Sequence, residues 1–186
     1  DAMGIAHRPV GRTEIAARLP MLRLDGITEA FEAEGAGMLF ASRIVTALAR
    51  WLAEAGVALH PDTRVTDLDP DSGTFRANGT SVRAATIVVA AGAWLPFIYP
   101  EAAPRLTPSR QAMLYLEPPS HLAKAWASAP VLVDQGNTHG AYILPPRGGT
   151  RLKIGDHVFS RRGNASDDRL ATAEDTAGVF TAAREI

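Results

Sequence analysis

Residues 140–157 read G-A-Y-I-L-P-P-R-G-G-T-R-L-K-I-G-D-H, and the interpretation of this sequence depends on them. Two short apolar runs flank a Pro-Pro-x-Gly-Gly segment, a combination that predicts two strands joined by a turn. Tyr142 lies in the first run, Lys153 lies in the second, and His157 follows four residues after the lysine. The stretch thus combines two predicted strands with three side chains that can take part in binding or catalysis.

The chain has 186 residues, of which 46% are apolar and 21% charged, with a formal net charge of -1. This composition is typical of one ordinary globular domain or two small lobes, and it gives no sign of a nucleic-acid or membrane partner. The absence of cysteine excludes disulfides, thiolate metal ligands and cysteine nucleophiles. No run approaches the roughly 20 apolar residues of a membrane span, and residues 1–7 lack a secretory-signal layout. We therefore expect a cytoplasmic protein.

The first half of the sequence alternates helical and strand patterns. We expect a short helix over residues 13–19, capped by Thr13, and a longer amphipathic helix that begins at Ser42 and ends before Gly56. Strands are predicted over residues 57–60, 64–68, 74–77, 82–83 and 86–91. The last of these is apolar throughout, which predicts a strand covered on both faces.

The second half begins after a proline-rich segment. Prolines recur every four residues from Pro96 to Pro108, which predicts an extended crossing and a domain boundary near Thr107. Beyond it we expect a short helix over residues 121–127, a final helix from Ser166, and strands over residues 111–117, 131–134, 141–144 and 152–155. The fold class is therefore mixed α/β.

Each candidate site residue has a structural interpretation as well as a functional one. Ala91, Gly92 and Trp94 follow an apolar strand, where small residues either let a ligand approach the backbone or allow a tight turn. Lys153 fits the solvent face of an edge strand, and Tyr142 and His157 fit an ordinary amphipathic surface. The other histidines, His7, His60, His121 and His139, lack metal-ligand spacing with carboxylates.

The pattern from Tyr142 through Lys153 to His157, together with A-A-G-A-W at residues 90–94, resembles the sarcosine oxidase and N-methyl-amino-acid oxidase family. These flavoproteins belong to the D-amino-acid-oxidase-like group. The resemblance implies that Tyr142 and His157 bind the substrate and that Lys153 promotes the reaction of reduced flavin with oxygen. It also implies FAD contacts at Val65, Ala91, Gly92 and Trp94, and a small amine or amino acid as substrate.

The resemblance covers residues from about 13 to 168 and corresponds to the middle of a family member. Its glycine-rich diphosphate motif G-x-G-x-x-G is absent, and Phe40 stands where the third glycine would follow Gly35 and Gly37. We expect residues 1–107 to be a partial FAD-binding domain and residues 108–186 a partial substrate domain. A chain of this kind should not hold FAD by itself, and it can self-associate. The alternatives are a dehydrogenase with another electron acceptor and a non-catalytic binding module.

Overall fold

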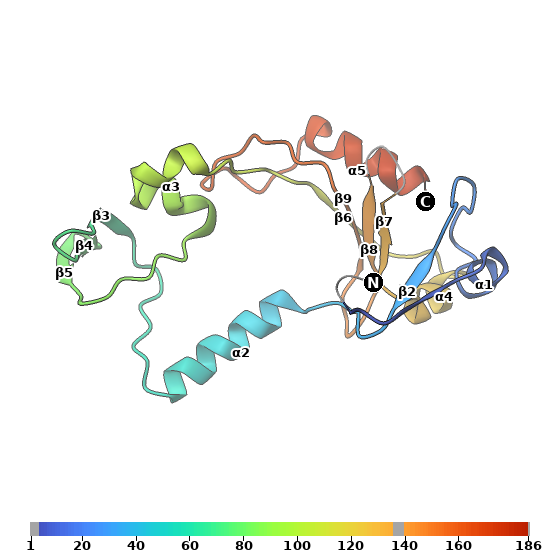
Figure 1. The fold of residues 1–186 in the computed structure, drawn as a ribbon, viewed down its shortest axis with the longest axis horizontal. Helices are drawn as coiled ribbons and strands as arrows, with labels where there is room; N and C mark the ends of the chain where they lie inside the picture. The colour runs from blue at the N-terminus through green and yellow to red at the C-terminus, as the bar shows by residue number, and fades with distance from the viewer. Residues whose placement is uncertain (1–3, 136–139, 186) are drawn as a thin grey trace. The chain divides into compact units, whose positions relative to one another are not determined.

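The computed structural model describes residues 4–135 and 140–185 (Figure 1). The chain divides into two units, and each unit combines separate segments of the sequence. Unit 1 contains Asp1–Met38, Gln111–Phe159 and Leu170–Ile186, and unit 2 contains Leu39–Arg110 and Ser160–Arg169. The predicted domain boundary near Thr107 stays a prediction. The assignment of the two sequence halves to flavin and substrate binding stays a prediction.

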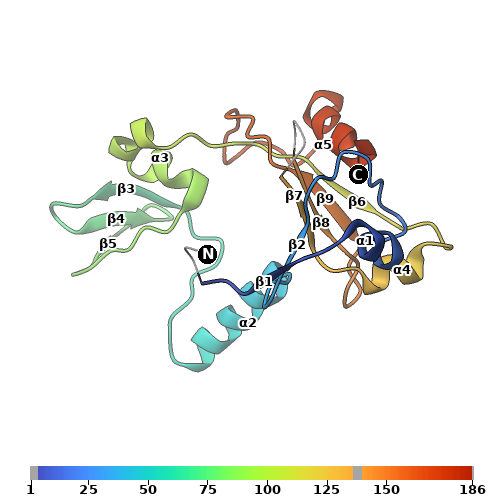
Figure 2. The same ribbon diagram turned by 45° about the vertical axis from the view of Figure 1, so that its right-hand side comes forward.

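A four-stranded antiparallel sheet forms the centre of unit 1, in the order β6-β9-β8-β7 (Figure 2). Its strands are β6 (Met113–Leu116), β7 (Leu132–Asp134), β8 (Ala141–Leu144) and β9 (Leu152–Asp156). All four strands predicted for the second half of the sequence are confirmed. The mixture of helices and antiparallel sheets also confirms the mixed α/β class.

One face of this sheet carries the hydrophobic core. Leu132, Ile143, Ile154 and Leu114 lie opposite one another across the four strands, and the last three are buried. Helices α1 (Arg12–Arg18), α4 (Ala123–Ser128) and α5 (Ala173–Glu185) complete unit 1. Each contributes side chains to the same buried cluster: Ile15 and Leu19 at α1, Trp126 at α4, and Val179 at α5. Alternation along the strands directs the intervening side chains to the other face.

The starts of α1 and α5 differ from the prediction. Helix α1 is preceded by Gly11 at the N-cap rather than capped by Thr13. Helix α5 begins at Ala173, later than the predicted Ser166, because Thr172 supplies the better cap. Its hydroxyl accepts a hydrogen bond from the Asp175 N–H at 3.1 Å, and the Asp175 carboxylate accepts one from the Thr172 N–H at 2.8 Å. This reciprocal arrangement is a capping box.

A charge cluster ties α1 to the hairpin of β1 (His7–Pro9) and β2 (Phe31–Ala33), two strands that the sequence did not predict. Arg8 binds Glu14 and Glu32, and Arg18 binds the same two carboxylates at 2.8 Å. The hydrogen bonds from Arg8 and Arg18 lower the pKa of Glu14 to about 2, and those from Arg18 and Arg8 lower the pKa of Glu32 to about 2. The cluster therefore favours ionised carboxylates in the folded protein.

Unit 2 contains the three-stranded meander of β3 (Val65–Asp69), β4 (Thr74–Ala77) and β5 (Thr80–Arg83), as predicted. Residues 57–60 and 86–91, predicted as strands, are not in a sheet, because no described strand lies beside them to accept their hydrogen bonds. Residues 86–91 are also not covered on both faces, since Val88 is 85% exposed. The proline-rich segment forms α3 (Leu95–Ile98) and the 3-10 helix η2 (Pro100–Arg105) instead of an extended crossing. Proline fits the first turn of each helix.

Helix α2 (Ala41–Glu54) confirms the long amphipathic helix, although it starts from Phe40 at the N-cap rather than from Ser42. Its apolar stripe of Ile44, Leu48 and Trp51 is exposed, and none of its residues is buried. Among residues 4–135 and 140–185, no helix combines the length and apolar character needed to cross a membrane.

The charge cluster predicts acid sensitivity. Because the pKa values of Glu14 and Glu32 fall from 4.5 to about 2 on folding, their stabilising contribution is complete above pH 4.5 and is lost as the pH falls toward 2. Thermal unfolding from pH 6 to pH 2.5 should therefore show a lower melting temperature for Glu14→Gln/Glu32→Gln near neutrality and convergence with the parent chain in acid. Glu29→Gln is the control. A constant difference across this range would contradict the assignment.

A second prediction concerns Gly178 in α5. A Cβ at this position would lie 3.0 Å from Oδ2 of Asp156, a β9 residue only 9% exposed, so the glycine permits the close approach of helix and strand. Glycine to alanine in a helix interior ordinarily stabilises by about 1 kcal/mol. We expect Gly178→Ala to lose that gain or to destabilise, and to stabilise when Asp156→Ala removes the obstacle. Urea unfolding of the single and double variants measures this coupling. Equal effects in both backgrounds would refute it.

Candidate functional site

The unit 1 sheet has a second face, opposite the core, which is here called the open face. It consists of Met113, Tyr115, Val133, Tyr142, Leu144, Lys153 and Gly155, which follow from the strand register. The predicted residues Tyr142 and Lys153 both belong to it, and His157 follows directly beyond β9. The structure therefore brings together the three residues that the sequence singled out in residues 140–157.

Tyr142 is the best-fixed side chain of the open face. It is directly opposite Gly155 in the sheet, and a Cβ at that glycine would lie 2.5 Å from its Cζ, so the ring lies on the glycine. Its hydroxyl donates to Sδ of Met113 at 2.9 Å. Burial raises the pKa of Tyr142, with smaller contributions from Tyr115 and Asp156. The phenol is consequently a neutral hydrogen-bond donor at physiological pH.

Lys153 extends its ammonium group toward aromatic rings. Nζ lies 5.6 Å from the ring centroid of Tyr142 and 6.0 Å from that of Tyr115. Among the salt bridges seen in residues 4–135 and 140–185, none joins Lys153 to a carboxylate. The open face therefore carries a positive charge that no observed ion pair neutralises.

His157 lies beside Tyr142, with their ring centroids 5.6 Å apart at an interplanar angle of 47°. Gly140 makes this position possible: its φ is +56°, and a Cβ there would lie 2.9 Å from Cδ2 of His157. Glycine adopts such a backbone conformation without steric cost. The glycine that opens the stretch therefore leaves room for the histidine that closes it.

The turn between β8 and β9 fixes which side chains reach the open face. Arg147 and Thr150 close it, with the Thr150 N–H donating to the Arg147 carbonyl at 3.0 Å and the Arg147 N–H donating to Oγ1 of Thr150 at 3.1 Å. The Arg147 guanidinium also donates to carbonyls after and within α4, including that of Ala129 at 2.6 Å. A cation at a helix C-terminus is favourable. These contacts anchor the turn to the rest of unit 1.

The predicted flavin-contacting residues lie in unit 2 and are described there by themselves. Val65 begins β3 and pairs with Ala77. Ala91 precedes the 3-10 helix η1 (Gly92–Trp94), where Gly92 has a φ of +53° and open space where a Cβ would stand. Trp94 is 46% exposed. The segment thus offers bare backbone, as predicted, and its contact with a cofactor stays a prediction.

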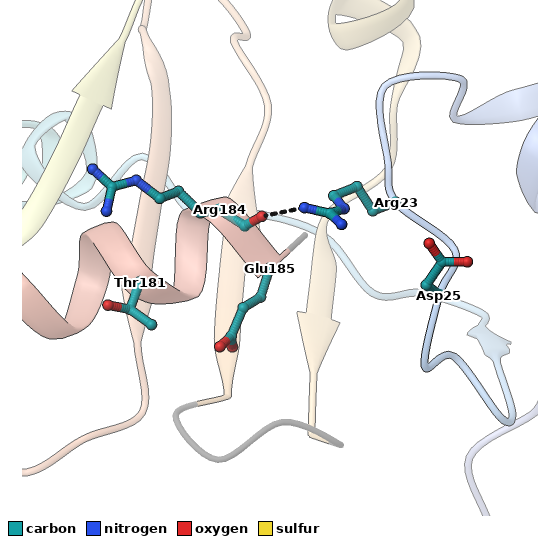
Figure 3. Close-up of a pocket in the computed structure, with 5 residues that line it drawn as sticks. All are labelled: Arg23, Asp25, Thr181, Arg184 and Glu185. Carbon is teal, nitrogen blue, oxygen red and sulfur yellow. Dashed lines mark hydrogen bonds between the residues drawn. The ribbon is translucent and has the colours of Figure 1, made fainter.

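A hollow of about 460 Å³ lies elsewhere in unit 1, at the C-terminal end of α5 (Figure 3). It is lined by Arg23, Asp25, Thr181, Arg184 and Glu185, and Arg23 donates to the Arg184 carbonyl at 3.5 Å. Its charges have both signs, so they do not converge on one kind of ligand. The described residues contain no group of three His, Asp or Glu that could hold a metal ion, and His139 lies outside them.

Three residues of the open face escaped the sequence interpretation: Met113, Tyr115 and Gly155. Met113 accepts the Tyr142 hydrogen bond, Tyr115 faces Lys153, and Gly155 makes room for the Tyr142 ring. The two β6 residues are about 40 positions from Lys153 in sequence, and only strand pairing brings them close. For Gly155, the isolated glycine within an apolar strand pattern was a usable signal of close approach.

The sequence model of the DAO family, described as FAD dependent oxidoreductase, matches residues 1–186. A search of curated proteins finds no match for this sequence.

The contact between Tyr142 and Gly155 predicts a strong effect of one added methyl group. Gly155→Ala would place a carbon 2.5 Å from the Tyr142 ring, and overpacking of this kind costs about 1–3 kcal/mol. We expect lower stability in urea unfolding and loss of the hydroxyl contact with Met113. In a Tyr142→Leu background the same substitution should cost much less. An equal cost in both backgrounds would show that the ring does not occupy that space.

Proposed function

Because the chain belongs to the FAD dependent oxidoreductase family, we propose that the open face takes part in oxidising the C–N bond of an amino acid or N-methyl amino acid, with oxygen as electron acceptor. The observation that carries this proposal is the Lys153 ammonium, which has no observed carboxylate partner within the described part of the chain and lies with Tyr142 on the open face, next to which His157 follows β9. A small-molecule amine as partner and a cytoplasmic location belong to the same proposal.

FAD is the cofactor of this family, and when bound it accepts the hydride from the substrate carbon. The described residues fit part of this group. The open face offers aromatic and cationic side chains suited to a planar ring system, and Gly92 offers accessible backbone. The diphosphate end finds no G-x-G-x-x-G in the sequence. Lys153 and Tyr142 would therefore adjoin the ring, and Val65, Ala91, Gly92 and Trp94 are proposed for the remaining contacts.

Lys153 is proposed to act on oxygen. Electron transfer to oxygen creates superoxide, an anion that a nearby cation stabilises. At ~4 Å and an effective dielectric constant of ~20, the attraction is about 4 kcal/mol, or roughly a thousandfold in rate. A carboxylate partner would cancel much of this field, so the absence of an observed ion pair supports the role.

Tyr142 and His157 are proposed to bind the substrate. The neutral phenol of Tyr142 donates to Met113, and its ring contacts His157, so the two side chains form one surface of mixed apolar and polar character. Pockets for small molecules combine such apolar walls with a few polar groups that fix orientation. An amino acid offers both an apolar part and charged groups to this surface.

Two other functions remain in competition. A dehydrogenase of the same family would use a different electron acceptor, and Lys153 would then hold a substrate or cofactor charge. A non-catalytic module would bind a ligand without redox chemistry. Stopped-flow measurement of oxygen reactivity separates the first alternative from an oxidase, and the lack of any substrate-dependent flavin reduction identifies the second.

In an FAD-loaded parent protein that contains this chain, Lys153→Met keeps the side-chain length and removes the charge. We expect anaerobic reduction by substrate to change little and reoxidation by oxygen to slow by about a thousandfold. His157→Asn and Tyr142→Phe should do the opposite, altering substrate binding or reduction with little effect on reoxidation. Stopped-flow absorbance of the flavin measures both half-reactions.

Lys124→Met is the matched control, because Lys124 is the other lysine of the sequence and lies in α4. It should change neither half-reaction. Unchanged reoxidation in Lys153→Met would refute the oxidase proposal and favour the dehydrogenase.

A further inference from the structure

Tyr115 on β6 is directly opposite Lys153 on β9 in the strand register. Side chains directly opposite each other in an antiparallel pair share a face and interact. Tyr115 is 57% exposed, so it contributes little to the core, and its ring is available to a neighbour on the open face. Lys153 is that neighbour.

The ammonium of Lys153 lies between two rings from opposite sides. Strand β9 runs between β6 and β8, and these strands carry Tyr115 and Tyr142 respectively. Nζ lies 6.0 Å from the first ring centroid and 5.6 Å from the second, both within the range of a cation–π attraction. At an exposed site each attraction favours the held position by about two- to fivefold.

Rings position a lysine in a way that a carboxylate does not. Two residues earlier in the sequence, Arg151 just before β9 forms an ion pair at 3.2 Å with Glu117, which directly follows β6, so a cation close to this pair of strands can be held by charge. Such a partner would restrict Lys153 but would also neutralise its field. Aromatic faces restrict the flexible chain and leave the full positive charge in place.

Tyr142 and Tyr115 differ in how many other contacts each ring makes. Tyr142 is already fixed by Gly155, by the hydrogen bond to Met113 and by contact with His157. Its substitution would disturb all three neighbours. Tyr115 can be changed with less disturbance of the described contacts, and its ring face rather than its hydroxyl is what meets Lys153.

We propose that Tyr115 is a positioning residue that holds the Lys153 ammonium over the open face. The inference rests on the proposed function for its catalytic meaning, since it is Lys153 that would act on oxygen. The position of the Lys153 side chain beside the Tyr115 ring is a property of this chain alone and can be measured without flavin.

The test uses the full chain labelled with carbon-13 lysine, which shows signals from only Lys124 and Lys153. Ring currents should shift the Lys153 side-chain methylene protons upfield of those of Lys124. Tyr115→Leu should remove a large part of this shift, and Tyr115→Phe should retain it because the ring face remains. Phe159→Leu, which removes an exposed ring just after His157, is the control and should leave the Lys153 signals in place.

Identical Lys153 signals in the unsubstituted chain and in Tyr115→Leu would overturn the proposal. The absence of an upfield shift in the unsubstituted chain would also overturn it, and that measurement does not depend on the folding of any variant. In an FAD-loaded parent protein that contains this chain, Tyr115→Leu should slow reoxidation about two- to fivefold, Tyr115→Phe should restore it, and substrate reduction should be unaffected. If Lys153→Met leaves reoxidation unchanged while Tyr115→Leu still moves the Lys153 signals, the oxidase function fails and the positioning role stands.

Discussion

The register between β8 and β9 is the constraint on which the candidate site depends. Leu144 is opposite Lys153, and Tyr142 is opposite Gly155. Because side chains alternate along a strand, a shift of one residue would turn Lys153 toward the core and Ile154 toward solvent. The core itself opposes that shift, since Ile143 and Ile154 are buried together beneath α5. Hydrophobic burial on one face thereby fixes the positions of the polar groups on the other.

The two faces of the unit 1 sheet differ in the kind of side chain that each can hold. The core face buries apolar side chains together with the carboxylate of Asp156, whose Oδ1 accepts from the Val158 N–H at 3.3 Å. The open face keeps Lys153 partly accessible, where an ammonium group retains its charge without the cost of deep burial. A lysine on the core face would lose its proton or destabilise the fold. The candidate site accordingly lies on the face where Tyr115 and Val133 are more than half exposed.

Much of unit 1 could be predicted from sequence because its signals are local. Alternating apolar residues identified all four strands, and glycines with prolines marked the turn between β8 and β9. The start of α5 was missed because Ser166 and Thr172 are both suitable caps, and only the partner Asp175 distinguishes them. The roles of Met113 and Tyr115 could not be predicted, because each depends on pairing between β6 and β9. A single sequence does not encode that pairing in any short motif.

The failed predictions in unit 2 have a common physical origin. Residues 57–60 and 86–91 have strand composition, and α2 has an apolar stripe, but among the described residues they have no sheet to join or cover. A strand forms only where a neighbouring strand accepts its hydrogen bonds, whereas the hydrogen bonds of α2 lie within the helix and form without a partner. On the open face the reverse holds: Tyr142 contacts Gly155, Met113 and His157 and also adjoins Lys153. In the sequence, Tyr142, Lys153 and His157 were grouped only by a resemblance to a family pattern. In the structure, Lys153 and His157 both lie beside the ring of Tyr142.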